Sequence, residues 1–278
     1  MAKIIAICNQ KGGVGKTTTA INLSTYLAFS SKRTLLIDID PQGNATSGLG
    51  INKHNIKTSI YDLVIDEIDP KPIIISTGID NLSLLPSTLS LTGAEVELVG
   101  IMGREYRLKK ALAPLAQDFD YIIIDCPPSL GLLTINALAA ADSVLIPIQC
   151  EYYALEGLSQ LVNTINLVKE NINSLLAIEG VLLTMADFRT NLTNEVINEA
   201  RKFFKEKVYA TVIPRNIRLT EAPGFGKPVA IYDKNSIGAI KYQEFANELL
   251  GIKKETVQEA VVDTSDNTMS SNELEKIA

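Results

Sequence analysis

The chain has 278 residues, of which 46% are hydrophobic and 21% charged, and its formal net charge is −6. This length and composition predict one large α/β domain followed by a tail, and they exclude attraction of the whole molecule to nucleic acid or an anionic membrane. The longest apolar stretch, residues 130–148, is interrupted by Asn136 and Asp142, so no window of about eighteen apolar residues predicts a membrane-spanning helix. The short apolar start does not resemble a signal peptide, and the three cysteines have no CxxC spacing. Both features indicate a cytoplasmic protein.

A glycine-rich loop follows the first predicted strand, an apolar run over residues 4–8, and precedes the first predicted helix at about 17–30. It consists of Lys11, Gly12, Gly13, Val14, Gly15, Lys16, Thr17 and Thr18. Backbone N–H groups of such a loop and the positive end of the following helix bind a polyphosphate. Lys16 would contact the terminal phosphates, and the Thr17 hydroxyl would contact Mg²⁺. The common form of the motif has glycine at position 10, but Gln10 stands here and Lys11 opens the loop. A purely structural turn is the alternative, and this combination of residues disfavours it.

Two further apolar runs end in carboxylates. Residues 34–40 (TLLIDID) predict a buried strand in which Asp38 and Asp40 point to the same side, with Asp40 nearer the loop. Residues 121–126 (YIIIDC) have the Walker B arrangement, in which Asp125 holds Mg²⁺ through a water beside the loop hydroxyl. Since ligands of open parallel sheets bind beyond the carboxyl ends of the strands, all three motifs predict one site. The alternative for Asp40 is a carboxylate that caps a turn.

The other predicted elements alternate between strand and helix. Strands are expected at 82–85, 143–148, 181–185 and 208–213. Helices are expected at 60–64, 95–115, 192–205 and 237–250, and one more follows residues 149–157 and ends at about 171. This alternation predicts a doubly wound, mostly parallel sheet. The helix at 95–115 is expected to be an amphipathic surface helix whose basic residues are solvated or, alternatively, contact nucleic acid. Residues 1–251 therefore form the predicted domain, and the acidic, polar residues 252–278 are expected to be disordered or weakly helical.

The loop KGGVGKTT resembles the deviant Walker A motif of the ParA/MinD group of P-loop ATPases. Four further stretches, QCEYYALEGL, LLTMADFRTNL, VIPRNIRLTEAPGFGKPV and SIGAIKYQEFANELL, resemble the partition ATPases called ParA or Soj. This resemblance implies an ATP hydrolase with weak basal activity that forms a homodimer with Mg-ATP and binds double-stranded DNA non-specifically. It also implies a ParB/Spo0J-like partner that stimulates hydrolysis, a role in chromosome or plasmid partition, and association with the bacterial nucleoid.

The same resemblance implies roles for individual residues. Lys11 would reach the nucleotide of the other subunit, and Asp40 would position the attacking water. Pro214 and Asn216 would lie near the adenine.

DNA contact is expected in the C-terminal half. Residues 185–227 carry eight basic and five acidic side chains, a local charge of +3 that leaves −9 for the rest of the chain. Charge identifies only a region, and it is the family resemblance that points to DNA. Arg189 and Arg218 are the preferred phosphate contacts.

Three alternatives stay open. A MinD-like, membrane-associated cell-division ATPase would need a basic amphipathic C-terminal helix, whereas this tail is acidic. An iron–sulfur carrier would need paired cysteines, and Cys126 and Cys150 are a poor pair. A scaffold in which ATP is only structural is disfavoured by Lys11 and Asp40.

Overall fold

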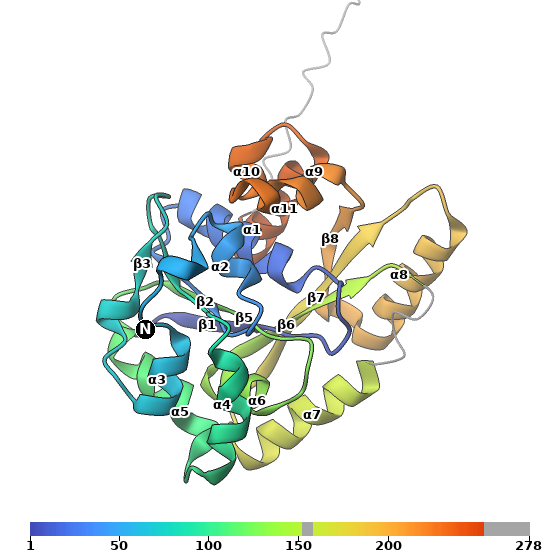
Figure 1. Ribbon diagram of the computed structural model, residues 1–278. Helices are drawn as coiled ribbons and strands as arrows, with labels where there is room; N and C mark the ends of the chain where they lie inside the picture. The colour runs from blue at the N-terminus through green and yellow to red at the C-terminus, as the bar shows by residue number, and fades with distance from the viewer. Residues whose placement is uncertain (152–157, 253–278) are drawn as a thin grey trace, which may run out of the picture.

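A computed structural model describes residues 1–151 and 158–252 of the chain, built around an eight-stranded sheet (Figure 1). The strands are β1 (Lys3–Ile7), β2 (Thr34–Asp38), β3 (Ile75–Ser76), β4 (Leu82–Leu85), β5 (Tyr121–Asp125), β6 (Ser143–Gln149), β7 (Ala177–Ala186) and β8 (Val208–Pro214). Their order across the sheet is β3-β4-β2-β5-β1-β6-β7-β8. Every pairing is parallel except β3 with β4. The predicted doubly wound sheet is confirmed.

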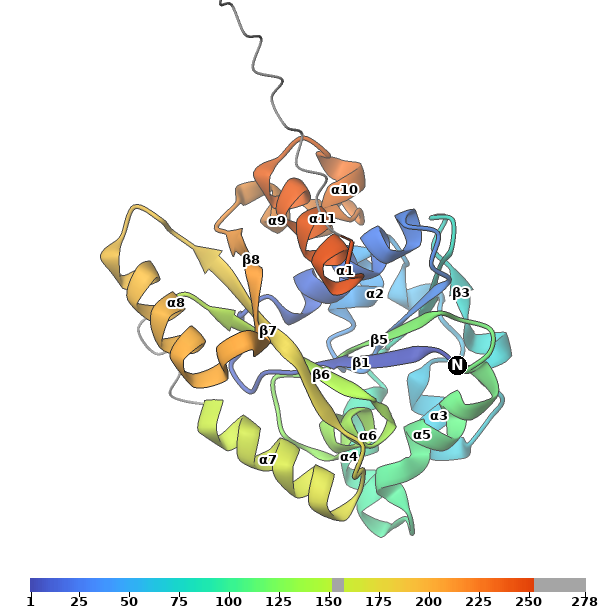
Figure 2. The ribbon, with the colours of Figure 1, turned by 180° about the vertical axis from the view of Figure 1, so that it is seen from behind.

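Helices cover both faces of the sheet, as Figures 1 and 2 show from opposite sides. They are α1 (Lys16–Phe29), α2 (Asn44–Gly48), α3 (Ile60–Asp66), α4 (Leu91–Glu97), α5 (Arg107–Leu112), α6 (Leu132–Ala140), α7 (Leu158–Asn171), α8 (Asn191–Phe204), α9 (Ile217–Glu221), α10 (Val229–Tyr232) and α11 (Ile237–Leu249). One core lies between the sheet and α3 to α8, and the other lies between the sheet and α1, α2 and α11. Alternate strand residues enter the two cores: Ile5 and Ile7 of β1 face α1, whereas Ala6 faces the other layer.

The expected helix at 95–115 is wrong. Helix α4 ends at Glu97, and short 3₁₀ turns lead to α5, which begins only at Arg107. Gly103 stands between them with a φ of 67°, a left-handed conformation that a continuous helix does not contain. The Arg107 side chain is only 14% exposed and pairs with Glu67 at 2.9 Å, so it is not a solvated surface cation.

Several expectations meet the limits of the described chain. Most of QCEYYALEGL and all but the first residue of the predicted tail lie outside the described residues. Within residues 1–151 and 158–252, no helix has the length and apolarity that crossing a membrane requires. The two-residue antiparallel strand β3 was not expected, because a segment of that length carries no periodicity.

The parallel strands bring distant segments to one edge. Ile7 of β1 pairs with Asp125 of β5, and Asp38 of β2 pairs with the same Asp125. Farther along the sheet, Ala186 of β7 pairs with Pro214 of β8. The loops after β1, β2, β5, β7 and β8 therefore all leave the sheet at its carboxyl edge, where α/β proteins bind ligands.

A close glycine contact ties the segment after β8 to α2. Gly226 ends the 3₁₀ turn Ala222–Phe225 with a φ of +62°, and a Cβ at this position would lie 2.6 Å from the Cα of Gly50. Gly50 itself has a φ of +80°. Since backbone atoms on both sides make this contact, a side chain here has no room.

We expect Gly226→Ala to lower the free energy of unfolding by about 2–4 kcal/mol, through backbone strain and overpacking together. Urea denaturation followed by circular dichroism measures the change. Gly224→Ala is the matched control, because a Cβ at Gly224 meets open space. Equal midpoints for the two variants would contradict the close contact.

Candidate functional site

A cavity of about 670 Å³ opens at the carboxyl edge of the sheet. Nine of the residues predicted for the site line it: Gly12, Gly13, Gly15, Lys16, Thr17, Thr18, Asp40, Pro214 and Asn216. They come from the loops after β1, β2 and β8, so the fold assembles one cavity from three separate motifs. Its size lies in the range of small-molecule and cofactor sites, about 300–1,000 Å³.

The glycine loop has the backbone that phosphate binding requires. Gly13 and Gly15 have φ values of +73° and +89°, which side-chain-bearing residues rarely adopt. Gly15 also directly precedes α1, so the positive end of this long helix faces the cavity side of the loop. The loop can therefore present main-chain N–H groups to an anion.

Lys16 is a buried cation at this helix start. Its side chain amine donates to the Lys11 carbonyl at 3.1 Å, and the residue is 7% exposed. Burial lowers the pKa of Lys16, while the nearby Asp125 carboxylate opposes that shift. A bound phosphate would supply the charge compensation that the buried amine lacks.

Asp125 ends β5 as a fully buried carboxylate. Neither of its oxygens has a hydrogen-bond partner of good geometry among the described residues. Burial raises the pKa of Asp125 well above its usual range and the charge of Asp38 raises it further, while the adjacent Thr17 hydroxyl opposes the shift. An unpartnered carboxylate beside the cavity that Thr17 lines fits a hard divalent cation, so Asp125 and Thr17 are the residues that would hold Mg²⁺.

Asp38 and Asp40 have different surroundings. Strand β2 ends at Asp38, so the strand alternation that placed both residues on one side does not extend to Asp40. The Asp38 carboxylate accepts hydrogen bonds from the Thr46 amide and hydroxyl, both at 2.7 Å, and burial raises its pKa to about 6. Asp40 lines the cavity, but its carboxylate also accepts from the Gln42 amide at 2.9 Å, which is the turn-capping contact of the alternative. Its carbonyl accepts from the Ser87 hydroxyl at 2.7 Å. Asp38 thus holds the loop together, and Asp40 both caps the turn and lines the cavity.

The geometry agrees with comparisons to known proteins. A family model described as an AAA domain matches residues 2–178. The sporulation initiation inhibitor protein Soj of Bacillus subtilis is 61% identical over 249 residues, which cover 90% of this chain and 98% of that one. The chromosome partitioning protein ParA of Myxococcus xanthus is 57% identical over 250 residues, 90% of this chain and 88% of that one.

The chain belongs to the ParA/Soj family of partition ATPases. Solved structures of similar proteins agree with this. Cobyrinic acid a,c-diamide synthase of Mycobacterium smegmatis, with a bound ATP analog and magnesium, has a TM-score of 0.80 and 39% identity, covering 90% of this chain and 95% of that one. An McdA–ATP complex from Cyanothece has a TM-score of 0.81 and 27% identity, covering 91% and 98%. The predicted cofactors, ATP and Mg²⁺, agree with the ATP analog and magnesium in the mycobacterial structure and with the ATP in the McdA complex.

In this ParA-type chain, three of the residues predicted to bind nucleotide or metal do not line the cavity: Lys11, Val14 and Asp125. Lys11 is half-buried, and its amide donates to the Asn9 side chain at 2.9 Å. Asp125 is fully buried, and its contact with the metal through water stays a prediction. Val14 directs its carbonyl to the Thr184 hydroxyl at 2.9 Å.

The sequence reasoning missed other lining residues. Among them are Gln42, Asn44, Thr184, Met185, Arg215, Leu219 and Tyr242. Gln42 and Asn44 lie within four residues of Asp40, and Arg215 stands between Pro214 and Asn216, so proximity to predicted residues was a usable signal for these three. Tyr242 belongs to the distant helix α11, and the packing of α11 on α1 and β8 places it here.

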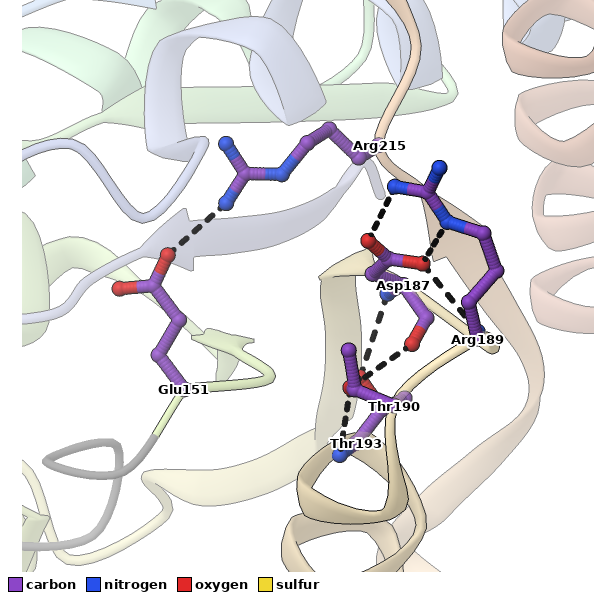
Figure 3. Close-up of polar contacts among 6 residues, drawn as sticks. All are labelled: Glu151, Asp187, Arg189, Thr190, Thr193 and Arg215. Carbon is purple, nitrogen blue, oxygen red and sulfur yellow. Dashed lines mark hydrogen bonds and ion pairs between the residues drawn. The ribbon is translucent and has the colours of Figure 1, made fainter.

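Of the two arginines predicted to contact DNA, Arg189 lies in the loop after β7 and Arg218 lies in α9, the helix that follows β8, at the same edge as the cavity. Figure 3 shows that Arg189 forms a two-pronged contact with Asp187, with its nitrogens 2.6 and 2.8 Å from the two carboxylate oxygens. Arg215 points the other way, to Glu151 at 2.8 Å. Arg218 pairs with Glu221 at 2.8 Å and with Asp233 at 3.3 Å. Each arginine thus has an acidic partner within the chain.

We expect Asp125→Asn to separate metal binding from stability. Without Mg²⁺ at neutral pH, the substitution should raise the free energy of unfolding by about 1–3 kcal/mol, because it removes an acid that must either be buried as a charge or take up a proton on folding. The raised pKa means that the folded wild type retains a proton where the unfolded chain has lost it, so wild-type stability falls as pH rises and the gain grows. Chemical denaturation at several pH values measures this effect.

In the same variant, Mg²⁺ should no longer tighten ATP binding, as calorimetry with Mg²⁺ and with EDTA would show. For the stability measurement, Asp120→Asn is the control, and it should lower the free energy of unfolding. The reason is that Arg33 lowers the pKa of Asp120 and stabilises its charge. An Asp125→Asn protein that keeps its response to Mg²⁺ would contradict the metal assignment.

Proposed function

We propose that this chain is a DNA-segregation switch in which Mg-ATP drives formation of a sandwich dimer that holds DNA. The cavity at the carboxyl edge, with the glycine loop, buried Lys16 and unpartnered Asp125, is the observation that carries the nucleotide half of this proposal. Slow hydrolysis, stimulated by a ParB-type partner, then returns the dimer to monomers that release DNA. The cargo is a chromosome or a plasmid, and the protein works in the cytoplasm on the nucleoid.

The proposed hydrolysis uses positioning and charge compensation. Lys16 and the loop amides hold the phosphates, and Thr17 and Asp125 would hold Mg²⁺, which would supply positive charge. Asp40 lines the cavity and positions the attacking water. Pro214 and Asn216 also line the cavity and would contact the adenine. Lys11, which does not line the cavity of its own chain, would reach the nucleotide of the other subunit.

The proposed DNA surface contains Arg189 and Arg218. Both lie beyond the carboxyl ends of neighbouring parallel strands, and Arg189 is 88% exposed on its side chain. Contacts of arginine with phosphate oxygens carry no base information, so binding would be independent of sequence and weakened by salt.

The first test measures dimerisation and DNA binding together. We expect size exclusion to show a dimer with Mg-ATP but not with ADP, and gel shifts to show that this dimer binds any duplex. Lys16→Ala should lose both properties because the phosphates lose their cation. Asp40→Ala should bind ATP and stay on DNA because hydrolysis stops.

The outcomes of this test separate the remaining candidates. A dimer that ignores DNA at low salt and pellets with anionic liposomes would favour the MinD-like function instead. Dimerisation and DNA binding that are unchanged by Asp40→Ala, with no response of hydrolysis to DNA plus the ParB-type partner, would favour the scaffold.

A second test concerns Arg189 and its acidic partner. We expect Arg189→Ala to weaken binding about equally for all DNA sequences and to reduce the salt slope by about 1, with ATP binding unchanged. Since DNA must displace Asp187 from Arg189, Asp187→Asn should tighten binding a few-fold. The side chain oxygen of asparagine can still accept the hydrogen bond from the Arg189 backbone amide that closes the turn. Fluorescence anisotropy with two unrelated duplexes over a salt series measures both effects.

A double-mutant cycle supplies the control. The gain from Asp187→Asn should vanish in the Arg189→Ala background, because the acid then has no arginine to release. Glu195→Gln, at an exposed position on α8, removes the same charge without touching Arg189. An equal gain from Glu195→Gln, or a gain that survives Arg189→Ala, would contradict the competition.

A further inference from the structure

We propose that Thr184 is a positioning residue of the nucleotide site, which fixes the direction of the Gly15 amide in the glycine loop. Thr184 lies near the end of β7 and is 2% exposed. Its hydroxyl donates to the Val14 carbonyl at 2.9 Å. The inference needs only the nucleotide site and stands whether or not the protein binds DNA.

The contact joins the loop to a strand that is not its neighbour. Strand β6 lies between β1 and β7, so the loop after β1 arches over the end of β6. Asn9 secures the first part of this arch, because its side chain amide donates to the Pro147 carbonyl of β6 at 2.7 Å. Thr184 secures the second part from β7. The loop is thus held at two points by side chains rather than by strand pairing.

The Val14 carbonyl and the Gly15 N–H belong to one peptide unit. The described chain contains no cis peptide bond, so these two groups point in opposite directions across one plane. A hydrogen bond that fixes the carbonyl therefore also fixes the N–H. The phosphates require this N–H, and a carbonyl turned toward them would repel them instead.

Glycine makes such a restraint necessary. Gly15 has a φ of +89°, and a residue without a Cβ can rotate its preceding peptide at little steric cost. The nearest neighbour that a Cβ on Gly15 would meet is the Thr184 methyl group, at 3.9 Å. The hydroxyl and methyl of Thr184 therefore hold the carbonyl and pack against the glycine at the same time.

The backbone around Thr184 is itself firmly held. The Thr184 carbonyl accepts from the amide of Cys150, which directly follows β6, at 2.9 Å. The Ala186 carbonyl accepts from the amide of Arg215, which directly follows β8, at 3.0 Å. Between them, Met185 lines the cavity with a φ of 52°, which is uncommon for a residue with a side chain. Such strain persists where the surrounding bonds over-determine the backbone, and it concentrates at functional sites.

The experiment compares four variants by nucleotide affinity and thermal stability. Thr184→Val keeps the shape but removes the hydroxyl. We expect it to weaken binding of both Mg-ATP and Mg-ADP about tenfold, because the Gly15 N–H is no longer held toward the charged phosphate and that hydrogen bond is lost. Thr184→Ser keeps the hydroxyl and should restore affinity to within about twofold. Thr25→Val is the matched control, since it removes a buried hydroxyl that donates to the Ile21 carbonyl within α1.

The outcomes discriminate positioning from stability. Thr25→Val should lower the melting temperature without changing nucleotide affinity. If Thr184→Val lowers the melting temperature but binds nucleotide like the wild type, or if Thr184→Ser binds as weakly as Thr184→Val, the proposal is wrong. Should Thr184→Val fail to fold, Thr184→Ala and Thr184→Ser form the deciding pair, because both lack the methyl group and only serine retains the hydroxyl. A wild type that binds no nucleotide would instead overturn the proposed function.

Discussion

The buried charges at the carboxyl edge of β5 and β2 are the constraint on which the rest of the site depends. Asp125 has no hydrogen-bond partner among the described residues, and its pKa is raised by burial and by Asp38. Lys16 lies close enough for Asp125 to oppose the fall in its pKa. Without ligand, two carboxyl groups and one amine thus share a low-dielectric space in which each charged form is costly. A divalent cation would compensate the carboxylate charge and a phosphate would compensate Lys16, so ligand binding offsets a stability cost of the empty site.

Parallel strand order determines which segments share this environment. The glycine loop, the Asp40 turn and the loops that follow β7 and β8 all leave the same edge. The nucleotide cavity and the two arginines therefore lie at one edge of the sheet, although the segments that form them are far apart in sequence. The opposite ends of the strands carry ordinary structural contacts, such as the ion pair between Lys3 and Glu179.

The sequence was sufficient where chemistry and local pattern coincide. The glycine loop, Asp40 and Asp125 each follow an apolar run, so strand, turn and ligand group are visible within a few residues. The prediction of one helix over residues 95–115 was wrong because the apolar spacing continues across Gly103, where the backbone is left-handed. The cavity contacts of Thr184 and Tyr242 could not be predicted, since each depends on tertiary packing between elements that no local period specifies. The acidic partners of Arg189 and Arg218 were counted as charge, but only the structure pairs them.

Strand β7 connects the two ends of the proposed switch by a short path. Thr184 holds the Val14 carbonyl. Asp187, three residues after Thr184, holds Arg189. Arg215 spans the same region from β8, because its amide bonds the Ala186 carbonyl while its side chain reaches Glu151. Spatial connection alone does not establish coupling, which requires an element with two arrangements that both ligands bias. Met185, with a φ of 52°, and Gly15, with a φ of +89°, are the residues of unusual backbone conformation on this path. A ligand that fixes the Gly15 amide therefore acts on the same short segment that carries the arginine and its acidic partner.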